Sequence, residues 1–153
     1  MSTFRELDSY DRVFNFGNYD SSVSLSEYQQ NGGYEALRMA IGNPKQALEE
    51  ICRAGLRGRG GAAFPAGLKL KMMQGNTEKQ RYIVCNADEG EPGTFKDRFI
   101  MNHIPFQLLE GITIAAILAG AENGFVYIRH EYPLAQETIK KSIAEAEAAG
   151  LLG

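Results

Sequence analysis

Residues 82–85 read Tyr-Ile-Val-Cys and residues 125–128 read Phe-Val-Tyr-Ile, two short runs of β-branched and aromatic side chains. Runs of this kind, bounded by polar loops, predict buried strands. Between them Pro105 opens a long stretch that is apolar on nearly all sides, which predicts a buried helix. Pro133 opens a last helix, which Gly150 ends. Strand, loop, helix, strand and helix in this order predict an α/β fold with a parallel sheet.

Shorter helices are expected before the first strand. Residues 24–27, Ser-Leu-Ser-Glu, have the spacing of a capping box, and residues 43–44, Asn-Pro, are a second helix start. Residues 1–22 show no apolar period and predict an extended or poorly ordered arm. We therefore divide the sequence into an arm with short helices over residues 1–54 and an α/β portion over residues 55–153.

The composition is that of a globular protein with a single domain. The chain has 153 residues, of which 44% are hydrophobic and 23% are charged, and its net charge is −3. A disordered chain has fewer apolar residues and a larger net charge. Proteins that bind nucleic acid without regard to sequence derive their affinity from cations, so no nucleic-acid partner is expected for this acidic chain.

The cysteines, the apolar stretches and the histidines argue against several further classes of protein. Cys52 and Cys85 are far apart and belong to no CxxC pair, which predicts neither a metal site nor a disulfide framework. The longest apolar stretch, residues 112–121, is too short to span a bilayer, and no signal peptide is visible. We expect a cytoplasmic chain that does not insert into a membrane. His103 and His130 lie far apart and no nucleophile elbow is present, so hydrolase chemistry has no support.

A glycine-rich loop is expected at residues 55–67, which read Gly-Leu-Arg-Gly-Arg-Gly-Gly-Ala-Ala-Phe-Pro-Ala-Gly. Gly58, Gly60 and Ala63 match the dinucleotide pattern G-x-G-x-x-A, although a helix rather than a strand is predicted before them. Glycine N–H groups can approach an anion closely, the neighbouring cations add positive charge, and Phe64 can stack on a planar ring. The alternative is a flexible linker, or glycines that serve tight turns.

An acidic loop follows the first strand directly, with Asn86, Asp88, Glu89 and Glu91. Ligands of open α/β sheets bind beyond the carboxyl ends of the strands. Carboxylates there accept hydrogen bonds from sugar hydroxyls but repel phosphate, so we expect the phosphate and the sugar of a ligand to lie at different ends of the site. The alternatives are a solvated acidic turn and a metal site, although the carboxylates lack the spacing of an EF-hand.

Together, residues 55–69 and 85–98 resemble the flavin- and NADH-binding subunit of respiratory complex I. The same module occurs in NAD-linked hydrogenases and formate dehydrogenases, and the resemblance extends from about Ser24 to Gly153. It implies a Rossmann-like, parallel-sheet FMN-binding domain, incomplete here and preceded by a short helical region. It also implies hydride transfer from NADH to FMN, followed by electron transfer to iron–sulfur clusters.

The resemblance also implies roles for individual residues. Gly58, Gly60 and Lys69 would lie against the flavin and its phosphate side. Phe64 would stack on the adenine of NADH, and Glu91 would help to hold the nucleotide. No protein residue is expected to be catalytic, because the flavin carries the chemistry. The implied cofactor-binding residues are Gly58, Arg59, Gly60, Gly61, Phe64, Lys69, Asn86, Asp88, Glu89, Gly90 and Glu91, of which Asn86, Asp88 and Glu89 would bond the flavin.

Four positions depart from the family's usual pattern. Ala63 and Ala66 replace a usual Gly and Thr, Leu70 replaces a usual Trp, and Met72 stands where an aromatic side chain often helps to sandwich adenine. An alanine at position 63 is costly if the backbone there needs a positive φ. These changes are expected to weaken NADH binding more than flavin binding.

Chains of this family continue well beyond the length seen here. The remainder carries a second flavin-binding motif, a ubiquitin-like domain and a cysteine-rich domain with a [4Fe–4S] cluster, so we expect this chain to be inactive as an isolated piece. A thioredoxin-like [2Fe–2S] subunit and further subunits of a larger complex are the expected partners. Through that complex the chain would lie peripherally at the inner face of a membrane. The alternative function is a non-catalytic truncated or split module that binds a partner without holding flavin alone.

Overall fold

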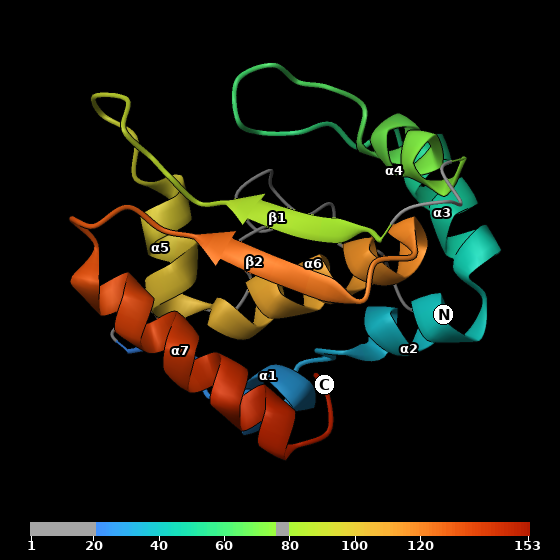
Figure 1. Ribbon diagram of the computed structural model, residues 1–153. Coiled ribbons are helices and arrows are strands. Elements are labelled where there is room, and N and C mark those ends of the chain that lie inside the picture. The colour runs from blue at the N-terminus through green and yellow to red at the C-terminus, as the bar shows by residue number, and fades with distance from the viewer. Residues whose placement is uncertain (1–20, 76–79) are drawn as a thin grey trace, which may run out of the picture.

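A computed structural model describes residues 21–75 and 80–153 of the chain (Figure 1). Nearly all of the arm predicted over residues 1–22 lies outside these residues. The elements in chain order are α1 Leu25–Gln30, α2 Glu35–Gly42, α3 Pro44–Arg53, α4 Ala66–Gln74, β1 Tyr82–Asn86, α5 Lys96–His103, α6 Pro105–Ala119, β2 Asn123–Tyr127 and α7 Pro133–Ala148.

The two strands form a parallel sheet, as the sequence predicts. Tyr82 pairs with Asn123 and the register runs to Asn86 opposite Tyr127. The chain passes from β1 to β2 through α5 and α6, which is the crossover that a parallel pair needs. The α/β class is therefore confirmed.

The expectation that both strands are buried is wrong, because the described helices cover only one face of the sheet. Side chains alternate between faces along a strand. Tyr82, Val84, Phe125 and Tyr127 share the open face and are between 44% and 65% exposed. The rings of Tyr82 and Phe125 lie 5.9 Å apart on this face.

Helix α6 lies at the centre of the fold behind the sheet (Figure 1). Its Phe106 and Leu109 join a buried cluster with Tyr28 of α1, Leu37 of α2 and Ala146 of α7. The N-terminal helices thus share a core with the α/β portion. The division of the chain at residues 54 and 55 stays a prediction.

Helix capping matches the sequence signals. The Ser24 hydroxyl accepts a hydrogen bond from Glu27 N, and the Asn43 side chain accepts one from Gln46 N. Helix α4 begins at Ala66, and the residue before it, Pro65, provides no side-chain cap.

Among the described residues, no single helix is long and apolar enough to cross a membrane. Helices α5 and α6 reach that length and composition only as a pair, and this pair is bent by 104°.

A buried carboxylate joins the N-terminal helices to α6. Glu110 is 6% exposed, and it accepts hydrogen bonds from the Tyr28 hydroxyl at 2.5 Å, from Tyr34 N at 2.9 Å and from Leu37 N at 3.0 Å. Two of these donors lie at the start of α2, where the helix dipole favours a negative charge. Burial and the neighbouring Glu110 raise the pKa of Tyr34 to about 12. Glu110 therefore fixes α1 and α2 on α6.

Replacement of Glu110 should destabilise the whole domain. In Glu110→Ala the Tyr28 hydroxyl and two backbone N–H groups lose their acceptor, and each unsatisfied buried donor costs about 1–3 kcal/mol. We expect the free energy of unfolding to fall by about 3 kcal/mol or more, measured by urea denaturation, and Tyr28→Phe to cost less. An unchanged midpoint in Glu110→Ala would contradict this assignment.

Candidate functional site

The glycine-rich loop leaves the body of the molecule between α3 and α4 (Figure 1). Two backbone bonds close its base, from Gly58 N to Phe64 O at 2.9 Å and from Ala66 N to Leu56 O at 2.8 Å. The Arg57 guanidinium donates to Ala63 O at 3.1 Å. The loop is therefore an ordered hairpin-like excursion and not a free linker.

The tip of this loop presents backbone donors for which the described residues provide no acceptor. Within the described part of the chain, no hydrogen bond uses the backbone N–H groups of Arg59, Gly60 and Gly61. A Cβ built on Gly60 or Gly61 would meet no atom within 4 Å, so the space around them is open. The Gly58 N–H, in contrast, is already used inside the loop.

Positively charged and apolar side chains are exposed in this loop and on α4, the helix that follows it. Arg59, Lys69 and Lys71 are exposed and make no ion pair with another described residue. Phe64 is 46% exposed, and Met72 is 67% exposed. Unpaired cations and free N–H groups beside an exposed ring have the chemistry to bind a phosphate attached to a planar group.

Close packing of two helices holds the base of the loop. Gly67, at the start of α4, lies against Cys52 of α3, and a Cβ at Gly67 would come within 2.4 Å of the Cys52 Sγ atom. Only glycine allows this approach, so Gly67 sets how α4 leaves the loop.

The backbone at Ala63 has a positive φ of 50°, in the left-handed region that favours glycine. The sequence resemblance implies glycine at position 63, so the alanine found there falls where a Cβ costs conformational energy. The penalty for a residue with a Cβ there is about 1–2 kcal/mol.

Ala63→Gly should therefore relieve strain in the loop. Glycine also gives the unfolded chain more entropy, at a cost of about 0.5–1 kcal/mol, so the matched control is Ala62→Gly at the neighbouring exposed position. We expect Ala63→Gly to be more stable than Ala62→Gly by about 1 kcal/mol in urea unfolding. Equal stability of the two variants would contradict the claim that the backbone at Ala63 is strained.

The acidic loop begins where β1 ends, at the carboxyl edge of the sheet. Ala87 N donates to Tyr127 O at 2.8 Å and continues the pairing one residue beyond the strand. Asn86 Oδ1 then accepts from Asp88 N at 3.1 Å, which turns the chain away from the sheet. The Thr94 hydroxyl and N–H both bond Glu91 O, which closes the far end of the loop.

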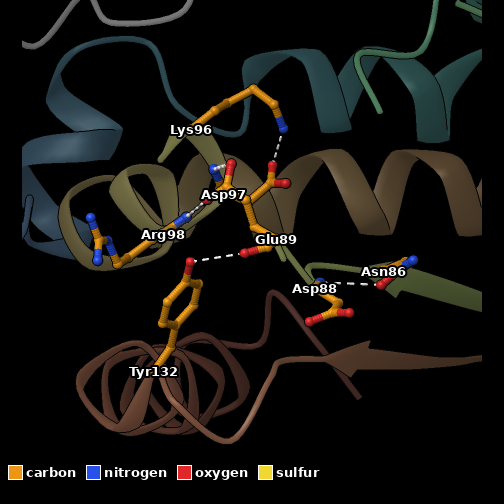
Figure 2. A network of polar contacts seen from close by, with 7 residues as sticks. All are labelled: Asn86, Asp88, Glu89, Lys96, Asp97, Arg98 and Tyr132. Carbon is orange, nitrogen blue, oxygen red and sulfur yellow. Dashed lines mark hydrogen bonds and ion pairs between the residues drawn. The ribbon is translucent and has the colours of Figure 1, made fainter. Parts of the chain in front are cut away.

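Glu89 differs from Asp88 and Glu91 in the same loop. It is only 7% exposed, and both of its carboxylate oxygens accept hydrogen bonds (Figure 2). Its Oε1 atom accepts from Asp97 N at 3.0 Å and its Oε2 atom from Arg98 N at 3.2 Å. These donors are in the first turn of α5, so Glu89 caps that helix from the preceding loop.

The backbone carbonyl of Glu89 is held by two side chains from the segment after β2. Arg129 donates to it from Nη1 at 2.7 Å, and the Tyr132 hydroxyl donates at 3.1 Å. For Arg129 and Tyr132 the sequence leaves two interpretations open, because residues 129–132 could line the site or form a polar turn before Pro133. Their signal is their position: they follow the second strand at the same carboxyl edge where Asn86 and Asp88 follow the first.

The side chains of Asp88 and Glu91 remain exposed and make no ion pair with the described residues. Asn86 is also exposed, and its amide nitrogen donates to no described atom. Asn86, Asp88 and Glu91 are therefore the polar side chains of this loop that stay available to a ligand. That Glu89 bonds a flavin directly stays a prediction, and both of its carboxylate oxygens are already used by α5.

The two loops lie on one side of the sheet, away from α7, in the view of Figure 1. No hydrogen bond or ion pair joins them within the ranges that the structure describes. One loop presents N–H groups and cations, and the other presents carboxylates and an amide. No three His, Cys, Asp or Glu side chains in the described ranges are placed to hold a metal ion.

Glu131 titrates far below the usual range. The Arg129 guanidinium hydrogen-bonds it and lowers its pKa from 4.5 to about 2, and the same pair raises the pKa of Arg129. Because the folded-state pKa is lowered, the contribution of the pair is complete above the ordinary carboxyl pKa and is lost as the pH falls through about 2.

The Arg129–Glu131 pair should therefore be insensitive to pH in the neutral range. We expect an NMR titration of the Glu131 carboxyl carbon to give a midpoint of about 2, and Arg129→Gln to return that midpoint to the ordinary carboxyl range. A midpoint near 4.5 in the unmodified chain would contradict the pairing.

A parallel sheet with exposed polar groups in the loops at its carboxyl edge is the arrangement of an α/β nucleotide-binding domain. A family model described as the Nuo51 FMN-binding domain matches residues 51–152. The chain belongs to this family, which confirms the resemblance found in the sequence.

Individual proteins agree with this assignment. A subunit of the NADH-quinone oxidoreductase of Rhizobium meliloti (strain 1021) is 50% identical over 131 residues, which are 84% of this chain and 31% of that protein. The corresponding NADH-quinone oxidoreductase subunit of Escherichia coli (strain K12) is 44% identical over 86% of this chain and 30% of its own length. The HndC subunit of the NADP-reducing hydrogenase of Solidesulfovibrio fructosivorans is 44% identical over 85% of this chain and 26% of its own length.

A solved structure shows the same fold. The crystal structure of an NAD+-reducing [NiFe]-hydrogenase in the air-oxidized state superposes with a TM-score of 0.69 and 37% identity, over 82% of this chain and 23% of that chain. The chain thus spans less than a third of the length of these relatives.

Proposed function

We propose that this chain forms the first part of the flavin- and NADH-binding subunit of an NADH dehydrogenase, with FMN held between the glycine-rich and the acidic loop. The observation that carries the proposal is the complementary chemistry of the two loops on one side of the sheet. Free N–H groups and cations lie on one, and free carboxylates lie on the other. This separation suits a ligand with a phosphate at one end and polyol hydroxyls and a ring at the other.

The residues of the chain bind and orient in this proposal. The N–H groups of Arg59, Gly60 and Gly61, together with the Lys69 ammonium, bind phosphate oxygens. Asn86 and Asp88 hydrogen-bond the flavin and its polyol. When held by these residues, FMN would supply hydride acceptance from NADH and one-electron transfer to iron–sulfur clusters.

NADH would lie over the same loops. The exposed Phe64 ring can stack on adenine, and Glu91, at the open end of the acidic loop, can accept hydrogen bonds from ribose hydroxyls. Phe64 is a rigid apolar surface beside unpaired cations, which suits an adenine nucleotide.

The open face of the sheet supports assembly with further polypeptide. Parallel sheets are normally covered on both faces, and Tyr82, Val84, Phe125 and Tyr127 leave a contiguous apolar face here. We propose that the remaining part of the subunit, with its [4Fe–4S] cluster, and a thioredoxin-like [2Fe–2S] subunit complete the electron-transfer unit.

The same open face favours one alternative, a module that binds a partner polypeptide without holding flavin by itself. Exposed apolar patches of this kind mark interaction surfaces. The proposed NADH dehydrogenase function and this alternative are distinguished by whether the chain retains flavin.

An FMN titration followed by flavin fluorescence tests the proposal. The chain is titrated alone, and also as a chimera in which it replaces the matching segment of the Rhizobium meliloti subunit. We expect saturable quenching in the chimera, and Lys69→Gln to weaken binding about tenfold, as loss of a charge-assisted hydrogen bond would. The control is Lys140→Gln, an exposed lysine on α7, which should leave binding unchanged.

Absence of FMN binding in both the chain and the chimera would overturn the proposal. Binding that Lys69→Gln and Lys140→Gln weaken equally would overturn the placement of the phosphate at the glycine-rich loop.

A further inference from the structure

The Glu89–Gly90 peptide is held from two directions at once. Arg129 and Tyr132 bond its carbonyl at 2.7 and 3.1 Å. The side chain of Glu89 is bonded to the first turn of α5 at 3.0 and 3.2 Å. The segment after β2 and the start of α5 therefore both contact one residue of the acidic loop.

The Arg129 guanidinium is itself held in a fixed plane. Its Nε and Nη2 atoms donate to the two carboxylate oxygens of Glu131, each at 3.0 Å, and its Nη1 atom is left for Glu89. The Arg129 carbonyl accepts from Gln136 Nε2 at 3.0 Å, which ties this turn to α7. A forked, bidentate pair gives geometric specificity that a lysine cannot supply.

The contacts close into a ring through Tyr132. The Cζ atoms of Arg98 and Arg129 each lie 5.4 Å from the centre of the Tyr132 ring, within the range of a cation–π contact. Arg98 N is also a donor to Glu89. Figure 2 shows Tyr132, at the start of α7, and Arg98, on α5, reaching Glu89 from different sides.

Two of the charges in this ring, those of Arg129 and Glu89, have partners of opposite sign. Glu131 compensates Arg129, and the N-terminus of α5 compensates Glu89. Arg129 donates no hydrogen bond to Asp88 or Glu91, whose side chains stay exposed, although Asp88 is next in sequence to the clamped residue and Glu91 is two residues beyond it.

We propose that Arg129 is a positioning residue for the cofactor site, which it serves by holding the Glu89 carbonyl while the side chains of Asp88 and Glu91 stay exposed to a ligand. Glu131 orients Arg129, and Tyr132 supplies a second donor to the same carbonyl. The proposal rests on the proposed function, because it assigns a ligand-binding role to the loop that Arg129 holds.

Three variants in the chimera separate these contributions. Arg129→Gln removes the charge and the fork, Arg129→Lys keeps the charge and loses the fork, and Tyr132→Phe removes a single donor but keeps the ring. The matched control is Arg38→Gln, an exposed arginine on α2. The measurements are the FMN dissociation constant, the amide hydrogen exchange of residues 88–95 and the midpoint of thermal unfolding.

We expect Arg129→Gln to weaken FMN binding about tenfold or more, as loss of a hydrogen bond to a charged donor would. Exchange in residues 88–95 should become faster, while exchange in α6 and the unfolding midpoint stay unchanged. Arg129→Lys and Tyr132→Phe should have smaller effects in the same direction, and Arg38→Gln should have none.

Unchanged loop exchange in Arg129→Gln would overturn this inference, and so would a general loss of protection across α6. Faster loop exchange with unaltered FMN affinity would also overturn it. If the unmodified protein binds no FMN while Arg129→Gln still frees the loop, the proposed function fails and the role in cofactor binding fails with it, but the clamp on the loop is retained.

Discussion

The site depends on the burial of one carboxylate, that of Glu89. A buried carboxylate is costly unless every oxygen finds donors. Here two N–H groups of α5 satisfy the side chain, and Arg129 and Tyr132 satisfy the carbonyl of the same residue. Because these donors come from α5 and from the segment after β2, a single residue fixes the loop that follows β1 against both.

This arrangement divides the acidic residues of the loop by function. Glu89 is buried and holds structure together, whereas Asp88 and Glu91 face solvent beside it. The glycine-rich loop shows a similar division, since the Gly58 N–H closes the base and the N–H groups at the tip stay free. In both loops internal bonds use some polar groups and leave the others exposed.

Periodicity, caps and turn residues predicted most of the fold. The start of α6 at Pro105, the caps at Ser24 and Asn43, and both strand positions agree with the structure. The burial of the strands could not be predicted, because an apolar run looks alike whether one face of a sheet is covered or both. Only the placement of α5, α6 and α7 decided that Val84 and Phe125 are exposed.

The sequence by itself determined the family, the two loops and the residue types available for cofactor binding, because these are local patterns that keep their spacing whatever the packing. It also marked position 63 as a departure, and the backbone there has the positive φ that makes an alanine costly. The tertiary structure alone decided which acidic side chain is buried and which partners hold it. Arg129 and Glu89 are 40 residues apart, and only the parallel pairing of β1 and β2, which brings both strand ends to one edge, puts them in contact.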